Sequence, residues 1–530
     1  MKERLTLAGE SAVPALLAKR RRSDLLLFIV LFFTLFSLTP LLILSGAAVG
    51  FSVLLGLLLA LLLAAAIIRW PVLGFFVLAG CALLVEQEPL PTPIFSDTLY
   101  VFHWPPQLEG FVERPVGLLA LFALLVWLLY RLVQRQTSLR GGFLFWPFLF
   151  YLLCAIGGAL YGLATGGNLK IIVLQTRPFW YMFVSYLLAY NLVTQKSHIR
   201  NFFWLVIASA GIKALQGLYI YLVLFQGDLK GHDTIMSHEE SFFFAALLLL
   251  VVIFCLHHRY RPQLFAALGV LPVVLVAMVA NQRRADYIAL FIGAVVVWVL
   301  VFRIKPAARK ALLIGLLLCI VLGVGYVFAF ARAEGSFAGP ARAVISLFDP
   351  SATDARDASS NLYRTFENND LKYTVKEYPA GLGFGKPFLQ PQPLTLIFPK
   401  ILEFDPYYNY VPHNTIYWIW VDLGPIGYFA LWLLIGTIVV RGSIVARQLR
   451  DPYLQVVAIY VVAITLMEVV VAFADYQLFF YRNVIYLGLL CGLLAKLPAL
   501  DQIEQKEVLL HESAHGLAAP ARSLMGSRHT

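Results

Sequence analysis

The sequence predicts an all-α polytopic integral membrane protein with about 12–14 transmembrane helices and one large outer loop that contains short helices. Hydrophobic residues make up 60% of the 530-residue chain, charged residues make up only 13%, and the mean hydropathy is +0.79. A soluble domain carries roughly 25% charged residues. The composition therefore excludes a soluble enzyme and a disordered chain. The apolar segments are also too long and too uniform for barrel strands.

Each predicted span is an apolar segment bounded by polar or helix-breaking residues. The spans are 24–46, 49–68, 71–86, 116–134, 143–164, 178–194, 201–225, 241–256, 263–281, 286–302, 311–331, 415–439, 453–473 and 482–498. Pro40 and Gly46 interrupt the crowded first region, so the expected number is a range. The spans divide the chain into an N-terminal tail (1–23), a first helical block (24–331), a large outer loop (332–414), a second helical block (415–498) and a C-terminal tail (499–530).

Basic residues set the orientation. When the cluster from Lys19 to Arg22 lies in the cytoplasm, alternation of the spans places nearly every short basic loop on that side, as the positive-inside rule requires. Both termini are then cytoplasmic. The net charge of +11 follows from this bias, and no nucleic-acid-binding signature accompanies it.

The outer loop 332–414 is too long for a structureless connector. Ser359 and Ser360 precede Leu362 and Phe366, whose spacing predicts a capped amphipathic helix over 360–377, ending before Pro379. We expect this helix to be ordered over a cavity on the outer face. The glycine-rich turn 381–385 follows, but it lacks the GxGxxG spacing of a nucleotide-binding loop.

Basic residues on the outer side break the positive-inside rule. Arg283 and Arg284 lie between two predicted spans, and Arg177 precedes Pro178 at a predicted outer helix start. An arginine in hydrocarbon costs roughly 2.5–3.5 kcal/mol and is usually functional where it is retained. Free N–H groups at a helix start also favour anions. The alternatives are an anion clamp, interfacial anchoring, or a local ion pair with Asp286.

His413 enters the first span after the outer loop. A neutral imidazole accepts a proton from a hydroxyl near pH 7, although a lone histidine is more often structural. Possible supporting residues are Asn414, Arg364, Lys213, Glu468, Asp475 and Arg482. Of these, Lys213 and Glu468 are expected to pair inside the bundle. No DxD, EF-hand or HExxH pattern and no CxxC occurs, so no metal site and no cofactor are expected.

Three short motifs resemble those of the bacterial O-antigen ligase and O-antigen polymerase superfamily. Residues 282–290, QRRADYIAL, resemble the family's S-R-G-A segment, with Arg284 in the arginine position and Arg283 in place of the serine. Residues 378–385, YPAGLGFG, resemble its P-x-x-G-x-G turn. His413-Asn414-Thr415 and the sequence DLGPIG at 422–427 resemble its H-N motif and the helix that follows. The likeness spans roughly 177–427.

The resemblance implies a metal-independent membrane glycosyltransferase of the bacterial inner membrane, with its active site facing the periplasm. Its donor is a glycan on a polyprenyl (undecaprenyl) diphosphate. His413 is the expected general base, and Arg177, Arg284 and Arg283 are the expected diphosphate ligands. The acceptor is lipid A–core for a ligase, which we favour, or a second lipid-linked repeat unit for an O-antigen or exopolysaccharide polymerase.

Two other classes remain open from the sequence. A polysaccharide or lipid-linked-sugar transporter is also polytopic and basic, but broken helices and an internal repeat are typical of it, and no repeat is found here. A non-catalytic membrane scaffold gives no reason for Arg177, Arg284 and His413 to share the outer face. We expect these three groups to lie roughly 10–15 Å apart.

Overall fold

The computed structural model describes residues 51–86, 115–135, 141–227, 234–257, 261–330, 333, 338–345, 355–397 and 407–518. Helices dominate these residues and no strand forms among them, which confirms the all-α class. The predicted span 24–46 lies outside the described residues.

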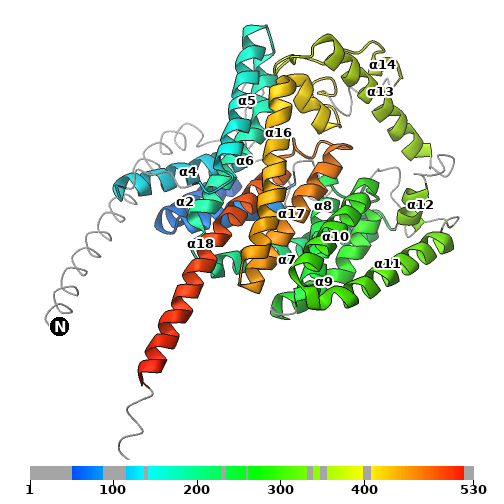
Figure 1. Cartoon of the computed structure of the whole chain (residues 1–530). Helices are drawn as coiled ribbons and strands as arrows, with labels where there is room; N and C mark the ends of the chain where they lie inside the picture. Colours follow the sequence, from blue (N-terminus) through cyan, green and yellow to red (C-terminus); the bar gives the residue numbers. More distant parts are fainter. Residues whose placement is uncertain are drawn as a thin grey trace, which may run out of the picture. The chain divides into compact units, whose positions relative to one another are not determined.

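The described helices follow the predicted apolar segments in order (Figure 1). They are α2 (Phe51–Arg69), α3 (Val72–Leu84), α4 (Pro115–Val133), α5 (Phe145–Ala164), α6 (Leu169–Leu192), α7 (Lys196–Tyr219), α8 (His238–His257), α9 (Arg261–Ala280), α10 (Arg284–Ile304), α11 (Arg309–Phe330), α12 (Gly339–Ile345), α13 (Ala355–Glu377), α14 (Leu394–Ile397), α16 (Thr415–Gln448), α17 (Pro452–Ala472) and α18 (Tyr481–Ala518). In the described part, 11 helical segments are long and apolar enough to cross a membrane, and α2 and α3 are shorter apolar helices. The protein is therefore polytopic.

The chain forms two compact units, 1–78 with 98–139 and 79–97 with 140–530. In the first unit, α2 and α4 pack through Ile67, Ile68 and Val126. Every residue that the sequence singles out for function lies in the second unit.

Close helix packing builds the core of the second unit. Helix α18 lies along α6, and Gly488 and Gly492 face it: an added Cβ would meet the carbonyl oxygen of Met182 at 2.4 Å and that of Tyr186 at 2.5 Å. Two small residues four apart allow such close backbone contact, as is common between membrane helices. Helix α17 packs against both α10 and α16 and is among the most buried spans.

Polar contacts gather the connecting loops at two ends of this unit. At one end Lys196 pairs with Asp451, and Gln263 donates to the carbonyl of Arg200 (2.8 Å). All four residues lie at the borders of predicted cytoplasmic loops. At the other end Asn281 binds the 236–241 segment and Asp475 binds His238. The loops predicted for one membrane face thus contact one another, as the alternation requires.

Three helix boundaries differ from the prediction. Helix α6 begins at Leu169, because the side chain of Asn168 caps it by accepting from the backbone N–H groups of Lys170 and Ile171. Helix α13 begins at Ala355, upstream of the predicted serine cap, although it ends before Pro379 as predicted. Helix α18 continues to Ala518, well past the predicted end of its span.

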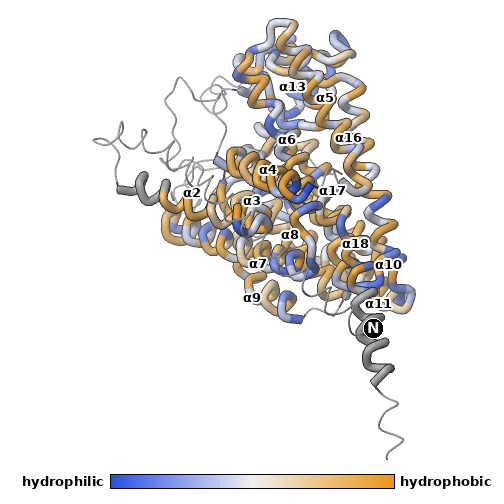
Figure 2. Tube along the Cα trace, turned by 90° about the vertical axis from the view of Figure 1, so that its left-hand side faces the viewer, coloured by the Kyte–Doolittle hydropathy of each residue, from blue (hydrophilic) through white to orange (hydrophobic). Residues whose placement is uncertain are grey.

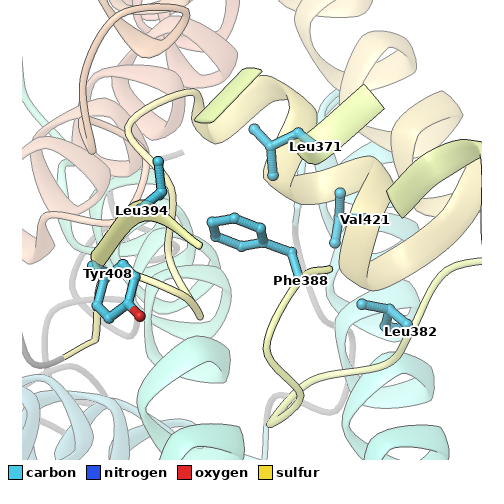
Figure 3. Close-up of a cluster of buried hydrophobic side chains, with 6 residues drawn as sticks. All are labelled: Leu371, Leu382, Phe388, Leu394, Tyr408 and Val421. Atoms are coloured by element: carbon cyan, nitrogen blue, oxygen red, sulfur yellow. The ribbon is translucent and has the colours of Figure 1, made fainter. Parts of the chain in front are cut away.

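Helix α13 stands apart in character from the spans. It is largely hydrophilic, whereas α5 and α16 carry mostly apolar residues (Figure 2). It packs against α16 and α14 through a small apolar cluster in which Phe388 lies at the centre (Figure 3). The buried members are Leu371, Leu382, Phe388, Leu394, Tyr408 and Val421. Burial of each such side chain contributes roughly 1.5–3 kcal/mol, which fixes the described part of the outer loop on α16.

Candidate active site

His413 lies between α13 and the start of α16, held by a buried carboxylate. Its Nδ1 is 3.1 Å from Oε1 of Glu367, and its backbone N–H donates to Oε2 of the same residue over 3.1 Å. Glu367 is fully buried, whereas the His413 side chain is 21% exposed. A carboxylate only accepts, so Nδ1 carries the shared proton. The remaining ring nitrogen, Nε2, is the atom left to take a proton from a substrate.

Aromatic rings fix the plane of this imidazole. The ring of Tyr476 lies 4.2 Å from that of His413, and the ring of Tyr363 meets it edge-on at 5.2 Å. Asn414, the next residue, caps α16 by accepting from the backbone N–H of Tyr417 (3.1 Å), and its amide donates to Asn368 of α13 (2.9 Å). The predicted H-N motif therefore has a structural half, Asn414, and a chemically available half, His413.

One face of α13 connects His413 with Arg284. The Arg284 guanidinium donates to the side chain of Asn361 over 3.2 Å. Asn361 and Asn368 are seven residues apart and therefore lie on the same stripe of the helix, about 10 Å apart along its axis. Arg364 lies on that stripe between them and is partly exposed. The structure thus places two guanidinium groups along α13 on the way to His413.

Arg283 and Arg284 have different surroundings. Burial raises the pKa of Asp475, but His238, Arg283 and His413 together outweigh it and hold the pKa well below its usual value. Arg283 thus serves this carboxylate, whereas Arg284 contacts α13. The backbone just before them is bent, since Gln282 has a φ of +54°, where a residue with a side chain costs roughly 1–2 kcal/mol. Fully buried Asn281 pins the bend to the backbone N–H of Met236 (3.0 Å).

The glycine-rich turn has a packing role. Gly381, Gly383 and Gly385 all have positive φ, which L side chains rarely adopt. A Cβ on Gly381 would lie 2.6 Å from the backbone nitrogen of Gly424, and one on Gly383 would lie 2.6 Å from that of Gly162. The turn is therefore threaded between α5 and α16 at Gly424, where non-helical backbone (φ +66°, ψ −168°) kinks α16.

Gln175 locks the same turn to two helices. Its amide nitrogen donates to Asp422 of α16 and to the carbonyl of Tyr410, each over 2.9 Å, and its oxygen accepts from the backbone N–H of Gly385 at 2.6 Å. These bonds fix the segment that leads into His413.

Arg177 is not at a helix start, so that prediction is wrong. Because α6 begins at Leu169, Arg177 and Pro178 lie inside the helix, and the Arg177 side chain is buried. The predicted span begins at residue 178 rather than at Leu169, because the polar residues Asn168, Lys170 and Gln175 interrupt the apolar segment. Its role as a diphosphate ligand stays a prediction.

The expected pair of Lys213 and Glu468 is also wrong. Lys213 pairs with Glu86 and lies 3.6 Å from Glu240, while Glu468 accepts from Asn483 at 3.1 Å. Arg482, fully buried, completes the ionic group around Glu240 (2.5 Å). No sequence pattern predicts this pairing, because Glu86 lies at the end of a predicted span far away in the chain. Within the described residues, no three His, Cys, Asp or Glu side chains are grouped to hold a metal ion.

Comparison with known proteins supports one family over part of the chain. Residues 273–433 match the sequence model of the O-antigen ligase family. This match places that segment in the O-antigen ligase superfamily. None of the curated proteins matches the sequence. The matched segment of this O-antigen ligase homologue runs from within α9 to within α16 and includes Arg284, Arg364, Glu367 and His413. This match and the 11 candidate membrane spans of the described residues are those expected of a multi-pass membrane protein of the O-antigen ligase and polymerase type.

The sequence missed several residues of this O-antigen ligase site. Glu367 and Asn368 lie in the predicted loop helix. Their positions in that helix, four residues after Tyr363 and next to each other, do not indicate a contact with His413. His238 begins α8, and Tyr476 lies in the turn between α17 and α18. The available signal was a histidine shortly before the predicted span 241–256.

Proposed function

We propose that this protein transfers a glycan from a polyprenyl diphosphate, such as undecaprenyl diphosphate, to a sugar hydroxyl at the outer surface of the bacterial inner membrane. The observation that carries the proposal is the arrangement along α13, where Arg284 contacts Asn361 and His413 binds Glu367. Guanidinium groups bind diphosphates in a forked geometry, and an imidazole on a carboxylate is a general base. The two groups are about one diphosphate-plus-sugar length apart along the helix.

The proposed reaction is a single displacement at the anomeric carbon. The acceptor oxygen forms a bond to this carbon as its proton passes to Nε2 of His413. The bond from the anomeric carbon to the diphosphate oxygen breaks, and its electron pair leaves with the lipid diphosphate. Glu367 stabilises the imidazolium that forms, since it accepts from Nδ1 over 3.1 Å.

The arginines offset the charge that grows on the leaving group. Arg284 is the best-placed ligand because it faces α13, and Arg364 lies one turn closer to His413 on the same stripe. Arg283 is a weaker candidate because it stabilises Asp475, and Arg177 remains a candidate from the sequence alone. Preorganised cations of this kind stabilise a transition state without a divalent metal, so we propose metal-independent transfer.

Lipid A–core is the acceptor we favour, which makes the protein a ligase that acts on the periplasmic face with both termini in the cytoplasm. A second lipid-linked repeat unit is the alternative, which makes it a polymerase of O-antigen or exopolysaccharide. The described part of loop 332–414, above all α13, then covers the active site. Both reactions use the same His413 and Arg284 chemistry and differ only in the acceptor.

The test is transfer by the purified full chain in detergent from an undecaprenyl diphosphate glycan. Lipid A–core and a second donor molecule are offered as acceptors in separate reactions, each with and without EDTA. We expect a coupled product with lipid A–core alone, unaffected by EDTA. Polymer from the donor alone would instead establish a polymerase. Loss with EDTA that magnesium or manganese restores would overturn the metal-independent mechanism, and no transfer in any arm would overturn the function.

A further inference from the structure

A second carboxylate–histidine pair lies next to Tyr476, whose ring contacts His413. Nδ1 of His238 is 2.9 Å from Oδ2 of Asp475. Cations hold the pKa of Asp475 below its usual value despite burial, which raises it. A carboxylate only accepts, so Nδ1 of His238 donates in this contact. Asp475 is buried, whereas 23% of the His238 side chain is exposed.

Asp475 anchors the turn that carries Tyr476. Its Oδ1 accepts from the backbone N–H of Tyr476 (2.9 Å), and its carbonyl accepts from the backbone N–H of Gln477 (2.8 Å) and from the hydroxyl of Thr415 (3.4 Å). Thr415 is two residues after His413, so the turn is fixed to the entry of α16. The ring of Tyr476 lies against the imidazole of His413 at 4.2 Å. His238 and His413 are thus connected through two residues.

His238 is itself held from behind. It begins α8, directly after Ser237, whose backbone N–H and hydroxyl both donate to Glu86 (3.0 and 2.5 Å). Asn281 also donates to the carbonyl of Ser237 over 3.3 Å. These bonds fix the backbone next to His238. The position of the His238 side chain is therefore well defined, and so is its contact with Asp475.

We propose that His238 is a positioning residue for the general base: through Asp475 and Tyr476 it holds the imidazole of His413 against Glu367. This inference rests on the proposed function and names a residue outside the segment that matches the O-antigen ligase family. Its physical basis is geometric. Displacement of a reacting group by about 1 Å costs roughly 100-fold in rate, and removal of His238 leaves Oδ2 of Asp475 without this 2.9 Å contact.

The experiment compares two substitutions of His238 in the full-length protein. In His238→Asn the amide nitrogen replaces Nδ1 and still donates to Asp475, whereas His238→Ala removes the donor. We expect kcat to fall roughly 10- to 100-fold in His238→Ala, with donor and acceptor KM nearly unchanged, and to recover largely in His238→Asn. His198→Ala, at the opposite end of the bundle, is the matched control and should match the wild type.

A double-mutant cycle with His413→Ala separates positioning from a general structural role. A residue that acts only through His413 costs nothing further once that imidazole is gone, so His238→Ala should leave the residual activity of His413→Ala unchanged. If His238→Ala lowers both backgrounds by the same factor, the positioning role is refuted while the glycosyltransferase function stands.

A chemical readout tests the same contact independently of the reaction. Diethyl pyrocarbonate modifies the accessible nitrogen of histidine, and mass spectrometry gives the rate at His413. We expect this rate to change several-fold in His238→Ala and to stay at the wild-type value in His238→Asn and His198→Ala. An unchanged rate in His238→Ala would overturn the inference even if transfer from the lipid diphosphate were never observed.

Discussion

Two groups of acidic and basic side chains in the same unit have opposite designs. Around Lys213, the partners Glu86, Glu240 and Arg482 are all fully or almost fully buried and bind one another. At His413, the carboxylate of Glu367 is equally buried, but the imidazole is 21% exposed. The first group is closed on itself, and the second leaves a ring nitrogen to the outside.

The exposure of one polar atom distinguishes a catalytic from a structural ionisable group inside a membrane protein. An ionisable residue in a span is a functional hypothesis by default, and on that ground Lys213 and Arg482 were candidates. Arg482, however, donates to the carbonyls of Ala82 and Leu83 as well as pairing with Glu240. These contacts join the ionic group to helix ends, whereas a base must keep one site for the substrate.

Removal of the open imidazole gives the largest expected effect. In His413→Ala we expect transfer to fall by roughly 10²–10⁴-fold, the usual contribution of general acid–base catalysis, with little change in thermal stability. Initial rates of glycan transfer and unfolding curves in detergent measure the two quantities. Near wild-type activity would remove the general base and leave the arginine ligands as the remaining part of the mechanism.

The closed group should respond in stability instead. Lys213→Met keeps the side-chain length but leaves buried Glu86 without its ion-pair partner and leaves Glu240 with Arg482 alone, which costs roughly 3–5 kcal/mol for a buried pair. We expect a clear fall in the melting temperature and in the yield of monodisperse protein. Lys196→Met, which breaks the partly exposed pair with Asp451, is the control and should cost less than about 1 kcal/mol. Equal effects of the two substitutions would contradict the distinction.

Arg284, which contacts α13 from the start of α10, should show an intermediate effect. Arg284→Lys keeps the charge but loses the fork, so we expect a roughly 10- to 100-fold lower transfer rate, since single transition-state donors contribute about that much or more. Arg309→Lys serves as the control, because Arg309 begins α11, beyond the far end of α10, and stacks on Phe302. A lysine at 284 that supports the full rate would mean that simple charge attraction is enough.

Local patterns predicted more of the fold than of the site. Apolar length alone located every membrane-crossing helix that the structure describes, because burial in lipid acts on each segment separately. The position of His413 at the start of α16 was predicted for the same reason. Its partner Glu367 was not, since contacts between residues 46 apart depend on how α13 packs. The first turns of α6 are polar, so the sequence did not show that the helix begins at Leu169. For this reason Arg177 was wrongly predicted to lie at a helix start.

The smallest expected effect is a pH dependence on the same face of α13. Burial and the neighbouring Glu367 raise the pKa of Asp370 to about 6, compared with about 4 in an unfolded chain. Between these pH values the folded protein keeps a proton that the unfolded chain releases, so this group's stabilisation is complete below pH 4 and is lost as the pH rises to 6.

The substitution Asp370→Asn removes this titration. Relative to the wild type it should therefore gain stability across this window, by roughly 1–2 °C in melting temperature. Unfolding curves at pH 4.5 and pH 7 measure the difference, with Glu377→Gln at the exposed end of α13 as the control. If the stability difference between Asp370→Asn and the wild type stays constant with pH, the pKa of Asp370 is not raised in the folded protein. Asp370 would then be electrostatically independent of Glu367, the carboxylate that binds His413.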